Sequence, residues 1–245
     1  MHHFFVDKGQ ITETEIQIVG TDVRHIRNVL RMQPGEELEI GDGRGSEYYC
    51  RIREINEEAV VAEILYRQQS EAELPSRIFL FQGLPKGDKL ELIIQKAIEL
   101  GAAEIIPVDM KRSVAKVDAK KAGKKQERWN GIAQSAAKQS KRGVIPQVTK
   151  PMSFREALVY ARQADVLLVP YEGAENMEET RKIISEIKPG QSVAVWIGPE
   201  GGFDREEVDA LKEQNGKIVT LGRRILRTET AGLAVLSILV YHLER

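Results

Sequence analysis

Cysteine and histidine are scarce in this sequence: its 245 residues include one cysteine, Cys50, and four histidines. A single thiol excludes an internal disulfide framework and a cysteine-rich metal site, and it favours a reducing compartment, so we expect a cytoplasmic protein. The histidines do not have the spacing of metal ligands, so we expect no metal. No Ser-His-Asp order with a nucleophile elbow is present. Covalent cysteine, metal and serine-hydrolase chemistry are therefore disfavoured.

Long apolar runs are also absent. The longest, residues 231–241, is shorter than the ~18–20 residues that a membrane-spanning helix needs. The first ten residues lack the apolar core of a signal peptide. Hydrophobic residues make up 42% of the chain and charged residues 30%, as is typical of a soluble globular protein. We expect one large domain or two modest ones, with no membrane association.

The net charge of −1 conceals a strongly basic stretch at residues 111–142. This stretch holds eleven lysine and arginine residues against two acidic residues, Asp118 and Glu127. Such a density of positive charge can neutralise the phosphates of a nucleic acid. A solvated helix face or a lysine-rich loop has the same composition. Both interpretations stay open at this point.

Residues 1–72 read as short strands separated by turns. Alternating apolar residues predict strands at 15–20, 36–43, 48–55 and 59–68. A short helix is expected at 22–31, with Thr21 as its N-cap. Its polar face carries Arg24, Arg27, Asn28 and Arg31. The pattern indicates a small β-barrel with a basic helix on its side, followed by a polar linker at 70–76.

From residue 73 onward, strands and helices alternate. Strands are predicted at 77–84, 103–110, 165–172, 192–200 and 217–222. Helices are predicted at 86–100, around 126–140, and at 153–163, 177–188, 204–214 and 229–244. Gly101 is placed to end the first helix, and both Ser153 with Glu156 and Asp204 with Glu207 have capping-box spacing. Apolar strands alternating with helices indicate an α/β fold with a parallel sheet covered on both faces.

A glycine-rich turn follows one of the apolar strands, where ligands bind in open parallel sheets. The turn, Gly-Pro-Glu-Gly-Gly at 198–202, has neither the ending of a P-loop nor the spacing of a dinucleotide fingerprint. Its glycines allow backbone N–H groups to approach a ligand closely. A turn has no steric need for the carboxylate of Glu200. A tight strand-to-helix turn, with glycines serving geometry alone, is the alternative.

The loop at 222–230, Gly-Arg-Arg-Ile-Leu-Arg-Thr-Glu-Thr, is long, because such connections usually take ~2–6 residues. Its apolar pair, Ile225 and Leu226, can wall a flat heterocycle, and its arginines can hold phosphate or stabilise a developing anion. A basic surface loop that plugs the core with two residues is the alternative. The helix after it is apolar almost all round, so we expect it to be buried on several sides by other segments, a second subunit or both.

Backbone groups, glutamates and arginines therefore dominate the predicted site. Such a site suits the positioning of a reactive cofactor beside a polar acceptor, with the cofactor carrying the chemistry.

Several motifs resemble those of the RsmE family, the 16S ribosomal RNA (uracil-N3) methyltransferases of the SPOUT superfamily. The similar stretches are "HIRNVLRMQPGEELEIGDG", "GLPKGDKLELIIQKAIELGA", "RSVAK", "RWNGIAQSAAKQSKRGVIP", "WIGPEGGFDREEV" and "LGRRILRTETAGLAVLSIL". The resemblance implies a PUA-like RNA-binding β-barrel at 1–72. It also implies a SPOUT methyltransferase domain at 73–245 with a C-terminal trefoil knot. S-adenosyl-L-methionine is then the cofactor, 16S rRNA in the small ribosomal subunit the substrate, and a homodimer the expected assembly.

The resemblance also suggests roles for individual residues. Arg227 is the expected stabiliser of charge on the uracil oxygens, and Glu229 or Glu200 the expected base, with solvent as the alternative acceptor. The expected cofactor-binding residues are Val169, Pro170, Tyr171, Ile197, Gly198, Pro199, Gly201, Leu221, Gly222, Ile225, Leu226 and Thr230. The expected RNA contacts are Arg24, Arg27, Arg31, Lys86, Arg112 and Arg142.

This sequence departs from the family pattern at three positions. His3 stands where an arginine is common, Arg223 where proline is common, and Lys141 where glycine is frequent. Three other functions remain alternatives: a methyltransferase of the same architecture acting on another RNA, a non-catalytic RNA-binding or assembly factor, and a doubly wound nucleotide-binding enzyme.

Overall fold

The computed structural model describes residues 1–116 and 119–244, which form two compact units. The N-terminal unit holds residues 1–73 together with 137–145, and the C-terminal unit holds the remainder. Positions 117 and 118 of the predicted basic stretch lie outside the described residues.

The N-terminal unit is built on a five-stranded sheet with the order β1-β3-β4-β5-β2. Its strands are β1 (His3–Phe5), β2 (Glu15–Val19), β3 (Glu37–Gly41), β4 (Ser46–Ile55) and β5 (Ala59–Gln69), with a short 3-10 helix at Lys8–Gln10. All neighbouring strands are antiparallel except β1 and β3, which are parallel. The four predicted strands are confirmed, whereas the three-residue β1 was not foreseen because it is too short to show alternation. The core of the unit contains Phe4, Ile16, Leu38 and Ile52.

The helix predicted at 22–31 consists of α1 (Thr21–Arg24) and a π-helical turn, η2 (His25–Leu30). Thr21 is the first helical residue and not the N-cap; the N-cap is Gly20, whose φ of 78° favours glycine. Arg31 ends the helix in the left-handed region, with φ 54°. The wider π turn and this left-handed end break the predicted spacing, so the arginines do not form one regular α-helical face. Arg24, Arg27 and Arg31 are nevertheless all exposed.

Residues 137–145 belong to the N-terminal unit through polar contacts. Arg142 is buried, with its side chain 4% exposed, and it pairs with Glu73. Lys138 Nζ lies 2.9 Å from Asp22 Oδ1. Lys141 adopts a φ of 56°, in the left-handed region, which is unfavourable for residues that carry a Cβ atom. Arg142 therefore forms an ion pair inside the unit and is shielded from solvent, which argues against its predicted role as an RNA contact.

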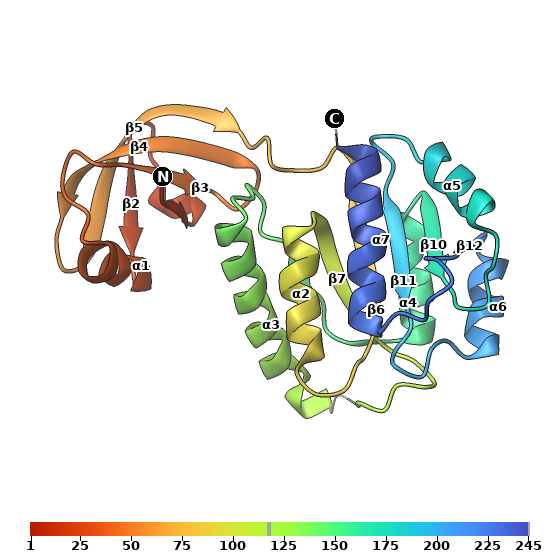
Figure 1. The fold of residues 1–245 in the computed structure, drawn as a ribbon. Helices are drawn as coiled ribbons and strands as arrows, with labels where there is room; N and C mark the ends of the chain where they lie inside the picture. Colours follow the sequence, from red (N-terminus) through yellow and green to blue (C-terminus); the bar gives the residue numbers. More distant parts are fainter. Residues whose placement is uncertain (117–118, 245) are drawn as a thin grey trace. The chain divides into compact units, whose positions relative to one another are not determined.

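The C-terminal unit has a parallel sheet, as predicted, with the order β12-β10-β11-β6-β7-β8 (Figure 1). Its strands are β6 (Ile78–Gly83), β7 (Ala102–Asp109), β8 (Gln147–Val148), β9 (Met152–Ser153), β10 (Val166–Pro170), β11 (Val193–Ile197) and β12 (Lys217–Val219), with β9 paired to β7. Its helices are α2 (Lys89–Glu99), α3 (Ala119–Gln139, with its last turn in the other unit), α4 (Phe154–Tyr160), α5 (Met177–Glu186), α6 (Arg205–Glu213) and α7 (Thr228–Leu243). A 3-10 turn at Ala161–Gln163 follows α4.

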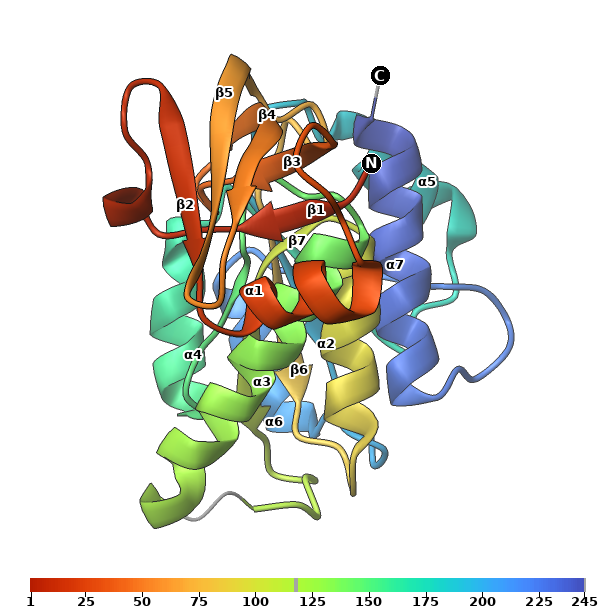
Figure 2. The same cartoon turned by 90° about the vertical axis from the view of Figure 1, so that its left-hand side faces the viewer.

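Helices cover both faces of this sheet. Helices α2 and α7 lie side by side on one face, as both views show (Figures 1 and 2). Residues of α4 and α6 pack on the other face around Trp196, whose ring stacks on Phe81 with centroids 4.4 Å apart. The predicted capping boxes of α4 and α6 are confirmed. Gly101, with φ 80°, follows the C-cap of α2 as predicted.

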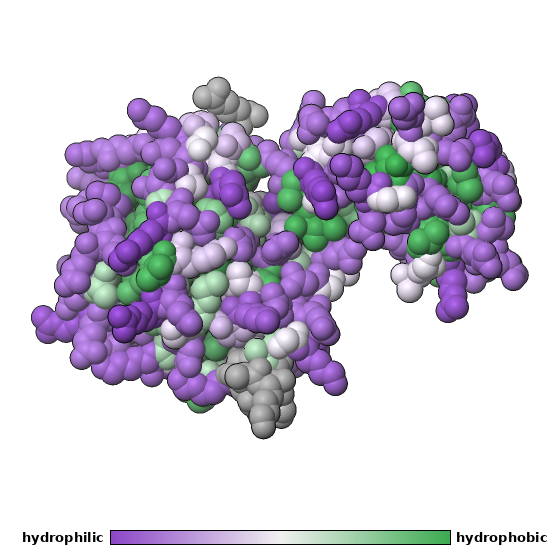
Figure 3. All heavy atoms as spheres, turned by 180° about the vertical axis from the view of Figure 1, so that it is seen from behind, coloured by the Kyte–Doolittle hydropathy of each residue, from purple (hydrophilic) through white to green (hydrophobic). Residues whose placement is uncertain are grey.

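Helix α7 is buried on one side and exposed on the other. Val235, Leu236 and Leu239 are fully buried, but Ile238 is 41% exposed and Tyr241 is 91% exposed. In Figure 1 the helix lies in front of the sheet of its own unit, and seen from behind each unit has a mostly hydrophilic surface (Figure 3). Within one chain, the expectation of burial on several sides is therefore met only in part. No helix in the described part of the chain is both long and apolar enough to cross a membrane.

Candidate functional site

A cavity of about 390 Å³ lies where β10, β11 and β12 end. Because these strands are parallel, the loops after them meet at one edge of the sheet, where open α/β sheets bind ligands. The lining comes from residues 170–172, 197–200, 202–203 and 220–228, with Lys89 and Ala231 from α2 and α7. The glycine turn at 198–202 and the loop at 222–230, both singled out from the sequence, therefore form one site together with the segment after β10, which holds the expected cofactor residues Pro170 and Tyr171.

Most of the predicted cofactor-binding residues line this cavity. They are Pro170, Tyr171, Ile197, Gly198, Pro199, Leu221, Gly222, Ile225 and Leu226. Glu200 and Arg227 line it as well. Four predicted residues do not: Val169 is fully buried in the core, Gly201 packs against Arg112, and Glu229 and Thr230 lie in the first turn of α7.

Several residues that line the cavity were not among the predicted cofactor-binding or catalytic residues. They are Lys89, Glu172, Gly202, Phe203, Thr220, Arg223, Arg224, Thr228 and Ala231. Lys89 comes from the start of α2, far away in sequence, just after β6 ends. Since β6 is the parallel neighbour of β11, the rule that ligands bind at strand ends could have pointed to it.

The glycine turn packs too tightly against its neighbours for side chains. A Cβ on Gly83, at the end of β6, would lie 2.6 Å from the backbone N of Pro199. A Cβ on Gly198 would lie 3.0 Å from the carbonyl carbon of Gly202. Gly202 itself has φ 68° and donates its N–H to the carbonyl oxygen of Pro199 at 2.9 Å. These glycines are required by close approach and backbone conformation.

Lys89 links the two carboxylates that were expected to act as bases. Its Nζ lies 3.0 Å from Glu200 Oε1 and 3.5 Å from Glu229 Oε2, and the backbone N–H of Lys86 also donates to Glu200 Oε1. Partial burial works to raise the pKa of Glu200, but the hydrogen bonds from Lys86 and Lys89 outweigh it, so this pKa lies below its usual value. The hydrogen bond to Glu200 raises the pKa of Lys89. A carboxylate with a lowered pKa is a weaker base, which argues against Glu200 as the proton acceptor.

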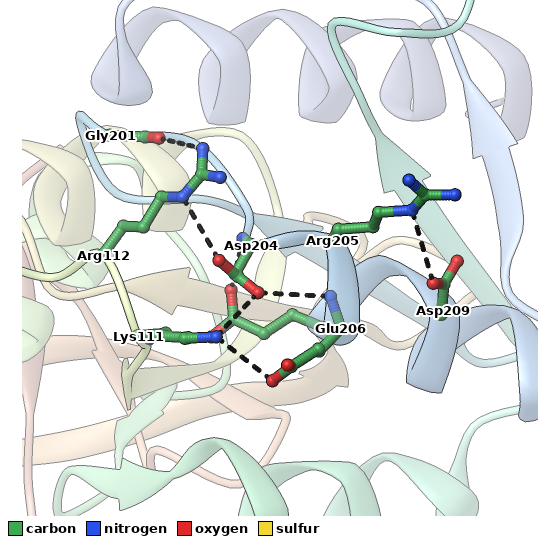
Figure 4. A network of polar contacts seen from close by, with 8 residues as sticks. Lys111, Arg112, Gly201, Asp204, Arg205, Glu206 and Asp209 are labelled. Carbon is green, nitrogen blue, oxygen red and sulfur yellow. Dashed lines mark hydrogen bonds and ion pairs between the residues drawn. The ribbon is translucent and has the colours of Figure 1, made fainter.

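A second polar network ties the start of the basic stretch to the glycine turn (Figure 4). Lys111 Nζ contacts Asp204 Oδ1 and Glu206 Oε2, each at 3.1 Å. Arg112 donates to the carbonyl oxygen of Gly201 at 3.2 Å and lies 3.6 Å from Asp204. The hydrogen bond from Lys111 is the main cause of the lowered pKa of Asp204. Arg112 is therefore exposed beside the turn but already engaged with it.

The arginines of the loop before α7 carry charge that no acidic residue in the described part of the chain neutralises. Arg223, Arg224 and Arg227 are exposed, and none of them makes an ion pair with a described residue. Ile225 is 85% exposed beside them. A ligand with negative charge and an apolar face would complement this loop.

Three residues considered in the sequence analysis lie outside this cavity: two exposed cations and one buried thiol. Lys86 is exposed next to the turn. In the N-terminal unit, Arg27 pairs with the exposed Glu57 at 3.4 Å. Burial raises the pKa of Cys50 in the same unit to about 12, so this thiol is unsuited to nucleophilic chemistry.

Two family models match the chain. One, described as an RNA methyltransferase domain, matches residues 72–240, and the other, described as an RNA methyltransferase PUA domain, matches residues 19–65. Ribosomal RNA small subunit methyltransferase E of Bacillus subtilis (strain 168) is 41% identical over 250 residues, covering 100% of this chain and 98% of the relative. The chain belongs to the ribosomal RNA small subunit methyltransferase E family.

More distant members give the same result. The protein of this name from Aquifex aeolicus (strain VF5) is 32% identical over 221 residues, covering 89% of this chain and 91% of the relative. The crystal structure of the Neisseria gonorrhoeae member, bound to S-adenosyl methionine, has a TM-score of 0.84 and 31% identity, covering 98% of this chain and 97% of that one. The family resemblance seen in the motifs is therefore confirmed, and a doubly wound nucleotide-binding enzyme is excluded.

Proposed function

We propose that this protein methylates N3 of one uridine in 16S rRNA of the small ribosomal subunit, using S-adenosyl-L-methionine. The observation that carries this proposal is the cavity formed by the three loops, in a chain of the ribosomal RNA small subunit methyltransferase E family. The family supports methylation of small-subunit RNA; the uridine and its N3 atom come from the motif resemblance.

The lining residues fit the cofactor. The cavity lies within the ~300–1,000 Å³ of small-molecule sites and combines apolar walls with a few polar groups. Ile197, Leu221 and Leu226 would hold the adenine ring, and the backbone of the glycine turn would meet the polar edges of the nucleoside. When bound, S-adenosyl-L-methionine supplies a methyl group activated by a positively charged sulfur.

Arg227 is the residue we propose to activate the acceptor. Uracil N3 carries a proton and is a poor nucleophile until that proton leaves, which places negative charge on the ring oxygens. Arg227 lines the cavity as the N-cap residue of α7, and its guanidinium makes no ion pair among the described residues. It is therefore available to stabilise this charge through charge-assisted hydrogen bonds.

Glu229 is the base we propose, in preference to Glu200. Its Oε2 is buried and accepts no hydrogen bond from a described residue, although Lys89 lies 3.5 Å away. Glu200, by contrast, is held by two donors that weaken it as a base. A carboxylate oxygen that accepts no hydrogen bond, with only the more distant Lys89 beside it, is a stronger base than one held by two donors.

Further features belong to the same proposal. We propose two domains: 1–72, which would bind RNA as a PUA-like unit, and 73–245, which would carry a trefoil knot through which α7 passes. The exposed Ile238 and Tyr241 support a homodimer through α7, because association would remove them from water. The enzyme would act in the cytoplasm, where ribosomal subunits are assembled. Among the expected RNA contacts we retain Arg24, Arg27, Arg31, Lys86 and Arg112.

The test is methyl transfer from labelled S-adenosyl-L-methionine to small ribosomal subunits from cells that lack the activity. Wild-type protein should label them, and Arg227→Ala should lower kcat by ~10²–10³-fold, as the loss of one preorganised donor does. Arg205→Ala is the matched control, because this arginine is highly exposed on α6 and outside the cavity. Wild-type kcat in Arg227→Ala under saturating substrates would remove Arg227 from the mechanism.

A further inference from the structure

Gln82 is a fully buried polar residue at the end of β6, on the sheet face that α7 covers. Its side-chain Nε2 donates to the hydroxyl of Thr228 at 2.8 Å and to the carbonyl oxygen of Gly83 at 3.0 Å. A carbonyl oxygen can only accept, so the contact with Gly83 fixes which end of the amide faces Thr228. Gln82 is therefore a donor to Thr228 and cannot exchange roles with it.

This fixed direction decides where the Thr228 hydroxyl points its single hydrogen. Because the hydroxyl accepts from Gln82, its hydrogen is directed to the carbonyl oxygen of Gly198, at 2.6 Å. The three groups form one directional chain, Gln82 to Thr228 to Gly198, which joins β6, the first residue of α7 and the glycine turn. Both Thr228 and Gly198 line the cavity.

The chain of hydrogen bonds determines the geometry of both halves of the site. The Gly198 carbonyl belongs to the peptide bond with Pro199, so fixing it also fixes the proline ring that lines the cavity. Thr228 directly follows Arg227, so the same hydroxyl anchors the start of the helix at the arginine. Gln82 Nε2 and the Thr228 hydroxyl are both hydrogen-bonded within this chain, whereas Gln82 Oε1 is buried without a hydrogen-bond partner among the described residues. The bonded groups of a buried network restrain its geometry.

We propose that Gln82 is a positioning residue, which holds the cofactor turn and the Arg227-bearing start of α7 in register through the Thr228 hydroxyl. This inference rests on the proposed function, because it concerns binding of S-adenosyl-L-methionine and methyl transfer at that cavity. Gln82 does not line the cavity, so its effect on catalysis is indirect.

The test is a double-mutant cycle on Gln82 and Thr228, with the dissociation constant of S-adenosyl-L-methionine measured by calorimetry and kcat by methyl transfer. Thr228→Val removes the hydroxyl at nearly constant volume, and we expect about tenfold weaker binding, the consequence of losing about one buried hydrogen bond. Gln82→Met should weaken binding similarly. The double variant should be no weaker than either single variant, because both break the same chain. Thr228→Ser keeps the hydroxyl and should recover most of the affinity lost in Thr228→Val.

The readouts separate positioning from simple support of the fold. A positioning role predicts a fall in kcat at saturating cofactor as well as weaker binding, since the start of α7 carries Arg227. Strictly additive effects of Gln82→Met and Thr228→Val, or wild-type affinity and kcat in Thr228→Val, would overturn the inference. If Gln82→Met does not fold, Gln82→Leu, which also lacks the donor to Thr228, replaces it in the cycle with the same expected and contrary results. Failure of the wild-type protein to bind S-adenosyl-L-methionine would instead overturn the proposed function.

Discussion

Substitution of Gly83 by alanine tests how closely the glycine turn must pack on β6. The new Cβ would lie 2.6 Å from Pro199 N, 2.7 Å from Pro199 Cδ and 3.0 Å from the carbonyl carbon of Gly198. Non-bonded carbon atoms prefer about 3.5–4.0 Å, so the turn would have to move by roughly 1 Å. The φ of Gly83 is not in the left-handed region, so alanine meets no backbone penalty and the effect comes from contact alone.

Two consequences are expected from that displacement. Overfilling a packed site lowers the free energy of unfolding by about 1–3 kcal/mol. Moving the turn by roughly 1 Å should weaken S-adenosyl-L-methionine binding or slow methyl transfer by up to about 10²-fold. Urea denaturation and calorimetric titration measure the two effects separately.

The matched control is Gly131→Ala in α3. A Cβ there meets nothing within 4 Å, so alanine should raise the free energy of unfolding by about 0.5–1 kcal/mol through its helix propensity and leave cofactor binding unchanged. Unchanged affinity and unchanged stability in Gly83→Ala would refute the close packing of the turn on β6.

Three further predictions concern charge and backbone conformation. Arg142→Met leaves Glu73 without its buried partner and should lower the free energy of unfolding by about 2–4 kcal/mol in urea denaturation. Lys141→Gly relieves the strain of the left-handed φ of 56° and should raise the free energy of unfolding by about 1 kcal/mol. The lowered pKa of Glu200 means that its stabilising contribution is complete above the unfolded-state pKa and is lost as the pH falls through the folded-state pKa. NMR titration of its carboxyl carbon should therefore give a pKa below the usual value of a glutamate side chain.

Each of these predictions has its own control and its own contrary result. Arg53→Met, which breaks an exposed ion pair, should change stability by less than about 1 kcal/mol. A similarly small loss in Arg142→Met would show that its ion pair is not buried in solution. A lower free energy of unfolding in Lys141→Gly would mean that contacts of the lysine side chain stabilise the fold by more than the strained backbone destabilises it. A Glu200 pKa at or above the unfolded-state value would contradict the hydrogen bonds from Lys86 and Lys89. The Glu200→Gln variant should lose less of its free energy of unfolding as the pH falls into the acid range.

The sequence was sufficient for the features that local signals encode. Apolar strands alternating with amphipathic helices predicted the parallel sheet, because burial on both faces removes the need for polar positions in a strand. The capping boxes and Gly101 were predictable because each depends on residues three or four positions apart. The rule that ligands bind at the ends of parallel strands pointed to the glycine turn, which lines the cavity.

What the sequence could not predict depends on contacts between distant segments. The pairing of Lys89 with Glu200 joins residues far apart in the chain, and so does the burial of Arg142 against Glu73. A lysine or arginine in a basic stretch has the same local pattern whether it faces solvent or an internal carboxylate. The π turn in the N-terminal helix also left no mark in the apolar spacing, since Val23 and Ile26 are buried in either geometry.

The most direct test of the proposed function is the identity of the modified nucleoside. Small ribosomal subunits from cells without the activity would be incubated with the protein and S-adenosyl-L-methionine, and the 16S rRNA digested and analysed by mass spectrometry with mapping of the position. The account predicts 3-methyluridine at a single site. A methyl group on another base or another RNA, or no methylation despite tight cofactor binding, would contradict it.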